Sequence, residues 1–121
     1  MISKPLYERL GGAQGIAKIV DDVVAGHLAN PLVQTRFQNV EDLQHLKQMA
    51  CEFFAEGSGG PEKYTGKDMR SAHKGMNISE QEYLSVMDDI MGALDKHNID
   101  EVTKKDVLAI LYSLKGEIIR V

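Results

Sequence analysis

Apolar side chains recur along this chain at the three- and four-residue spacing of amphipathic helices. One stripe covers residues 16–28 and closes at Asn30-Pro31, and a helix of about fifteen residues is expected from Asp42. Two further stripes cover residues 83–94 and 107–118. The chain has no sustained strand-like alternation and no internal repeat, so the sequence predicts an all-α protein.

Capping residues indicate where these helices begin and end. A short helix over residues 6–10 should stop at Gly11-Gly12. Ser79 and Glu82 have the spacing of a capping box, and Thr103 and Asp106 repeat it. We therefore expect one long helix to start after Ser79 and the last one to start after Thr103.

The connection at residues 59–75, GGPEKYTGKDMRSAHKG, is long and rich in glycine. Gly59, Gly60 and Pro61 break the preceding helix, while Gly66 and Gly75 bracket a segment too short for another ordinary one. A plain helical bundle needs only a short connection, and long loops in small domains usually have a function. The loop carries His73, which is our candidate iron ligand.

Length and composition limit the remaining possibilities. The 121 residues fit one domain over residues 1–121, and the net charge of −4 with interleaved acids and bases disfavours nucleic acid and anionic membrane as partners. The first residues lack the apolar run of a signal peptide, so a cytoplasmic protein without a membrane span is expected. Cys51 is the only cysteine, which excludes an internal disulfide, and no C-x-x-C-H motif offers the usual covalent haem attachment.

Five segments together resemble the group I truncated haemoglobins. They are LYERLGG at residues 6–12, Phe37, the pair Phe53-Phe54, GGPEKYTGKDM at residues 59–69 and AHKG at residues 72–75. Their order and spacing match that family over essentially the whole chain. The resemblance implies a two-over-two helical sandwich that encloses haem b in a monomer.

The resemblance also assigns roles to individual residues. His73 falls on the proximal iron ligand and Phe37 on the ring that stacks on haem. Tyr64 and Lys67 are candidates to reach the propionates, with a solvated position in the loop as the alternative for each. A neutral imidazole suits haem iron when its other nitrogen donates to a backbone carbonyl. The further side chains expected around haem are Val24, Leu46, Met49, Ala50, Phe53, Phe54, Met69, Met76, Ile78, Tyr83, Val86 and Leu111.

The distal side departs from the family pattern. The family usually places tyrosine and glutamine where this chain has Val24, Leu46 and Ala50. None of these three can donate a hydrogen bond, although a donor would stabilise a partly negative gas ligand by roughly 1.5 to 3 kcal/mol. The sequence therefore predicts fast oxygen release when the sixth position is open.

Three other side chains are candidates to restore polarity there. Compared with the family, this chain has one extra residue between Phe37 and Phe53. A shift of helix register at that point would bring His45 towards the iron as a sixth ligand. The alternative is that His45 is simply an exposed residue of the helix. Met49 is a second candidate ligand, with ordinary core packing as its alternative. His27 lies on an apolar stripe, where a buried imidazole needs a hydrogen-bond partner.

Two functions remain compatible with the sequence. The first is a haem protein that binds O2, CO or NO. Its role would be oxygen binding or transport, electron transfer, or conversion of nitric oxide to nitrate, and an unidentified reductase would be its partner. The second is a haem-free interaction or sensor module on a globin-like core. A visible Soret band after purification or haem supplementation distinguishes the first from the second.

Overall fold

The computed structural model describes residues 4–121, and the expected all-α class is confirmed. Residues 1–3, which belong to the expected single domain, lie outside this range. The helices are α1 (Leu6–Arg9), α2 (Gly12–Ala29), α3 (Gln34–Gln38), α4 (Leu43–Gly57), α5 (Met69–His73), α6 (Glu80–Lys96), α7 (Glu101–Ser113) and α8 (Lys115–Ile118). Within residues 4–121, no helix is long and apolar enough to cross a membrane.

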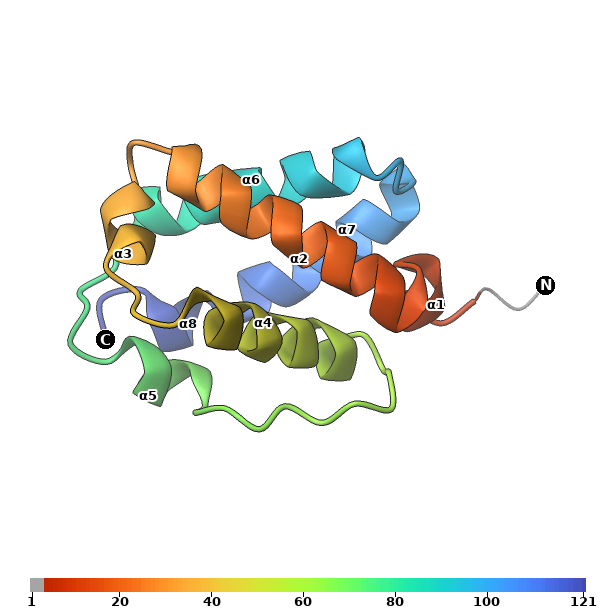
Figure 1. Cartoon of the computed structure of the whole chain (residues 1–121), viewed down its shortest axis with the longest axis horizontal. Helices are drawn as coiled ribbons and strands as arrows, with labels where there is room; N and C mark the ends of the chain where they lie inside the picture. Colours follow the sequence, from red (N-terminus) through yellow and green to blue (C-terminus); the bar gives the residue numbers. More distant parts are fainter. Residues whose placement is uncertain (1–3) are drawn as a thin grey trace.

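The long helices form two layers. In Figure 1, α2 and α4 lie in the nearer layer and α6 and α7 lie behind them. α2 packs on both α4 and α6, and α6 packs on α7. The apolar core between them includes Val20 and Leu94, which are almost completely buried. The expected two-over-two sandwich is therefore confirmed, because amphipathic stripes on four helices meet in one core.

The chain between α4 and α6 runs outside this sandwich. Figure 1 shows it passing beneath α4 and ending in α5, which lies beside α8. α5 packs on α8. The glycine-rich connection thus holds no helix longer than five residues, as its glycines predicted.

Two helix boundaries near the chain's end differ from the sequence expectation. The last long helix starts at Glu101, because the Asp100 carboxylate accepts from the Thr103 backbone N–H and caps the helix three residues earlier than predicted. The expected single helix over residues 107–118 is also wrong, since it divides at Leu114 into α7 and α8. There the Leu111 carbonyl accepts from the Leu114 N–H and from the Tyr83 hydroxyl, which turns the chain.

The start of α6 is confirmed, and its cap also anchors α3. Ser79 and Glu82 form the predicted capping box. Glu82 also accepts from Arg36 of α3, with Oε2 2.5 Å from Nε and Oε1 3.2 Å from Nη2. This pair ties α3, which carries Phe37, to the first turn of α6.

The Arg36–Glu82 pair should make the free energy of unfolding depend on pH in the acidic range. The hydrogen bond from Arg36 lowers the pKa of Glu82 from 4.5 to about 2, so its stabilisation is complete above pH 4.5 and is lost as pH falls towards 2. Glu82→Gln keeps the capping geometry but removes the charge, and we expect it to lower the free energy of unfolding at pH 7 by about 2 kcal/mol.

Urea unfolding of both proteins between pH 7 and pH 2.5 measures this effect. The difference between wild type and Glu82→Gln should shrink as the pH falls. Glu80→Gln, an exposed change in the same first turn, is the matched control. A difference that stays constant with pH would show that the ionised pair is not its source.

Candidate functional site

His73 lies on α5, the five-residue helix that ends the glycine-rich connection. The side chain is half-buried, and its Nδ1 lies 2.8 Å from the Met69 carbonyl oxygen. A carbonyl can only accept, so this contact assigns the proton to Nδ1 and leaves the lone pair of Nε2 free. A neutral imidazole fixed in this tautomer is suited to ligate a metal ion.

The loop before α5 is attached to α4 through two carboxylates. Glu52 Oε1 accepts from the Thr65 backbone N–H at 2.8 Å and from the Thr65 hydroxyl at 2.6 Å. Glu56 Oε1 accepts from the Tyr64 N–H at 3.1 Å. The Thr65 hydroxyl is the main reason that the pKa of Glu52 is lowered. Sequence reasoning missed both glutamates, although their spacing of one helical turn was a signal that they share a face of α4.

The same loop is attached to α1 through Tyr7, another residue that sequence reasoning did not assign to the site. The Tyr7 hydroxyl donates to Glu62 Oε1 at 2.8 Å, and this bond is the main cause of the raised pKa of Tyr7. The Tyr7 ring also lies against Gly60, where a Cβ atom would come within 2.4 Å of it. Only glycine fits at Gly60, so α1 and the loop pack at this point as one unit.

Most of the large apolar side chains predicted to contact haem are only half-buried. Phe53 meets Tyr64 edge to face, with ring centroids 5.3 Å apart. The residues predicted to contact haem that are half-buried are Phe37, Leu46, Met49, Ala50, Phe53, Phe54, Tyr64, Met69 and Val86. Val24, Ile78, Tyr83 and Leu111 are buried, whereas Met76 and Lys67 are exposed.

The hydroxyls of the two tyrosines in this set are bound to backbone carbonyls. Tyr64 donates to the Lys67 carbonyl at 2.5 Å, and Tyr83 donates to the Leu111 carbonyl at 2.5 Å. Burial raises the pKa of Tyr83 to about 12, so it stays protonated. Tyr64 thus shapes its own loop, while Lys67 presents a cation at the loop's surface.

Phe37 lies against a buried polar cluster. Its ring stacks on His27, with centroids 4.6 Å apart and planes 24° apart. His27 Nδ1 lies 2.8 Å from Asp89 Oδ2, which also accepts from Asn30 at 2.9 Å. The prediction that His27 needs a structural partner is confirmed. The bond to Asp89 holds the His27 ring in place, and Phe37 stacks on that ring.

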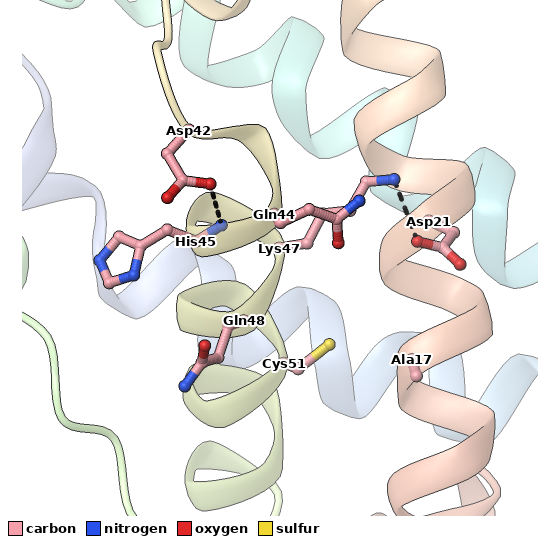
Figure 2. Close-up of a pocket in the computed structure, with 8 residues that line it drawn as sticks. All are labelled: Ala17, Asp21, Asp42, Gln44, His45, Lys47, Gln48 and Cys51. Atoms are coloured by element: carbon pink, nitrogen blue, oxygen red, sulfur yellow. Dashed lines mark hydrogen bonds and ion pairs between the residues drawn. The ribbon is translucent and has the colours of Figure 1, made fainter.

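His45 is an exposed residue of α4 and is one of those that line a groove between α2 and α4. Figure 2 shows its ring pointing away from α2, while Lys47 reaches across to Asp21, 3.2 Å away. This groove has a volume of about 460 Å³, and Cys51 is also among the residues that line it. Burial raises the pKa of the Cys51 thiol, so a thiolate ligand is disfavoured at neutral pH. Several charged and polar side chains line this groove, among them Asp21, Lys47 and Gln48. Leu46, Met49 and Phe53 lie on another face of α4.

The donor set around His73 fits a cofactor that brings most of its own ligands. Among residues 4–121, no three histidine, cysteine, aspartate or glutamate side chains gather to hold a bare metal ion. A single half-buried histidine, together with half-buried apolar side chains on α3, α4 and α6, instead suits a flat apolar macrocycle with a metal at its centre. Haem has this shape, and the residues present fit it.

Comparison with known sequences gives one family across the chain. The family described as bacterial-like globin matches residues 5–120. Group 1 truncated haemoglobin GlbN of Mycolicibacterium paratuberculosis is 28% identical over 113 residues, covering 93% of this chain and 82% of that protein. The group 1 truncated haemoglobin of Tetrahymena pyriformis is 27% identical over 112 residues, covering 91% and 92% of the two chains.

Solved structures give the same architecture. The Fe(III) form of the truncated haemoglobin from Tetrahymena pyriformis superposes with a TM-score of 0.93 at 24% identity, over 98% of this chain and 100% of that one. The group II truncated haemoglobin from Bacillus anthracis superposes with a TM-score of 0.87 at 20% identity, over 100% and 95%. At these identities the likeness establishes the fold.

Proposed function

Because the chain belongs to the bacterial-like globin family, as its resemblance to the group 1 truncated haemoglobins predicted, we propose that it holds haem b through His73 and binds a diatomic gas. The observation that carries this proposal is the contact from His73 Nδ1 to the Met69 carbonyl, which leaves Nε2 free. When bound, haem supplies an iron that takes a diatomic ligand such as O2, CO or NO at its open position.

The chain's own residues have distinct tasks in this proposal. His73 holds the iron, and the loop fixed by Glu52, Glu56 and Tyr7 sets the position of its helix. Phe37, backed by His27, and the half-buried side chains of α4 and α6 cover the apolar faces of the macrocycle. The exposed ammonium of Lys67 is available to a propionate.

The distal side supplies no hydrogen bond to a gas ligand. Val24 and Ala50 belong to the same apolar core cluster, and Leu46 lies one turn before Ala50 on α4. A partly negative ligand therefore finds neither a donor nor a proton relay among these three. We propose fast release rather than storage, and any conversion of nitric oxide to nitrate would draw the electron that reduces the iron again from an external reductase.

Addition of haemin to the purified chain tests the proposal. We expect one equivalent to bind with a Soret band that shifts on reduction and again on addition of CO. If no Soret band develops after haem supplementation, a haem-free interaction module becomes the better reading of this core.

The spin state in the same spectra tests for an internal sixth ligand. His45 and Met49 both lie on α4, and His45 is exposed. A high-spin ferric spectrum at neutral pH indicates a position open to exogenous ligands. A low-spin spectrum that becomes high-spin in His45→Ala identifies His45, and one that responds only to Met49→Leu identifies the thioether.

A further inference from the structure

α5 is too short to hold its shape without support. Its backbone bonds include those from Ala72 N–H to the Asp68 carbonyl and from Lys74 N–H to the Arg70 carbonyl. An isolated helix of this length is unstable in water, because too few hydrogen bonds offset the cost of nucleation. The position of His73 must therefore be set by whatever α5 packs against.

α8 is the helix that packs on α5. Ile118 of α8 is only 6% exposed, and it forms a small apolar cluster with the buried Ile78 and Tyr83. Met69, the first residue of α5, packs against the same cluster. Met87 of α6 packs against both this cluster and the main core, so the cluster connects α5 to the sandwich.

Backbone hydrogen bonds attach the residues after α8 to those after His73. The Gly75 N–H donates to the Val121 carbonyl at 3.2 Å, and the Arg120 N–H donates to the Ile78 carbonyl at 2.9 Å. Ile78 and Ile119 form a parallel bridge between these two bonds. Gly75 has φ of 86°, which glycine adopts without strain. The segment that leaves His73 is thereby fixed at both of its ends.

The turn that directs α8 to this place is itself held from α6. Tyr83 belongs to α6, and its hydroxyl donates to the Leu111 carbonyl at the end of α7. The chain turns at Leu114, so α8 diverges from α7 and reaches α5. Residues 114–121 thus connect the sandwich to the segment that carries His73.

We propose that residues 114–121 act as a clamp that sets the position of His73, with Ile118 as its positioning residue. Ile118 supports α5 through the cluster against which Met69 packs, while the bonds of Arg120 and Val121 fix the chain that follows His73. This inference rests on the proposed function, because it concerns how firmly His73 can hold the iron of haem.

Ile118→Ala tests the clamp, and Leu108→Ala is the matched control because Leu108 is an exposed apolar residue of α7. Hydrogen exchange at Ala72 and Lys74 should become roughly tenfold faster in Ile118→Ala, since this change truncates a buried side chain of the cluster that supports α5. Exchange in α2 should not change. Haem loss to excess apomyoglobin should accelerate by a similar factor, and the ferrous iron–histidine stretching band should shift.

Deletion of residues 119–121 is a second variant, which removes the two backbone bonds and retains Ile118. It should show the same pattern, and it replaces Ile118→Ala if that chain does not fold. Unchanged exchange in α5, or an equal rise of exchange in α2, would overturn the clamp. So would faster exchange in α5 with unchanged haem loss and an unchanged stretching band. A wild type that takes up no haem overturns the proposed function, and the clamp's role falls with it.

Discussion

Replacement of His73 by glycine should abolish stable haem binding. The Nδ1 of His73 is bound to the Met69 carbonyl, so the other ring nitrogen of this half-buried side chain is available to the iron. Loss of a residue that merely orients a ligand costs a metal site ten- to a hundredfold in affinity, so removal of the ligand itself should cost at least about a hundredfold. Added imidazole should restore binding, because His73→Gly leaves space for it.

Titration of haemin into His73→Gly, with and without imidazole, measures this loss and its rescue. His97→Gly is the control, because His97 lies at the C-terminal end of α6 and its Nε2 pairs with Asp22 of α2. A normal Soret band and unaltered haem affinity in His73→Gly without imidazole would transfer the ligand role to another residue.

Replacement of Val24 by tyrosine should slow oxygen dissociation by roughly tenfold or more, provided that the hydroxyl reaches the gas ligand. Val24 lies on α2, is 4% exposed and belongs to the apolar core beside α4. A hydroxyl there would donate to a partly negative ligand in a dry environment, where a hydrogen bond is stronger than in water. The same change should slow autoxidation.

Val24→Phe is the matched control, because it adds the same ring without the hydroxyl. Stopped-flow measurement of oxygen release should show slow release for Val24→Tyr and nearly wild-type release for Val24→Phe. Equal slowing in both variants would point to steric obstruction instead of a hydrogen bond. An unchanged rate in Val24→Tyr, with its hydroxyl beside the ligand in a structure, would refute the electrostatic argument.

Local patterns in the sequence predicted most of the helices. The start of a helix at Asp42, the capping box at Ser79 and the stripe of α2 depend on residues within one or two turns of each other. The start of the last long helix was predicted incorrectly at Thr103, because Asp100 and Thr103 can both cap a helix. In the structure Asp100 is the cap, and it accepts from the Thr103 hydroxyl. The division of the last helix depends on Tyr83, a residue far away in the sequence.

The candidate ligand was also visible in the sequence, but its surroundings were not. Glycines on both sides of His73 marked it as a residue outside the long helices. The assignment of haem and of the pocket residues came from the resemblance to a family. Neither route indicated that Glu52, Glu56 and Tyr7 hold the loop, because these contacts form only when the elements pack.

By itself, the sequence determined the helix periods, the capping box at Ser79 and the position of His73 outside the long helices, since each depends on neighbours along the chain. Only the tertiary structure decided what holds His73 in place. The bond from Tyr7 to Glu62 joins residues 55 positions apart, and the bond from Arg120 to Ile78 joins two distant segments. Such pairs have no local signature, because the free energy that selects them comes from burial of the whole core rather than from the residues' own propensities.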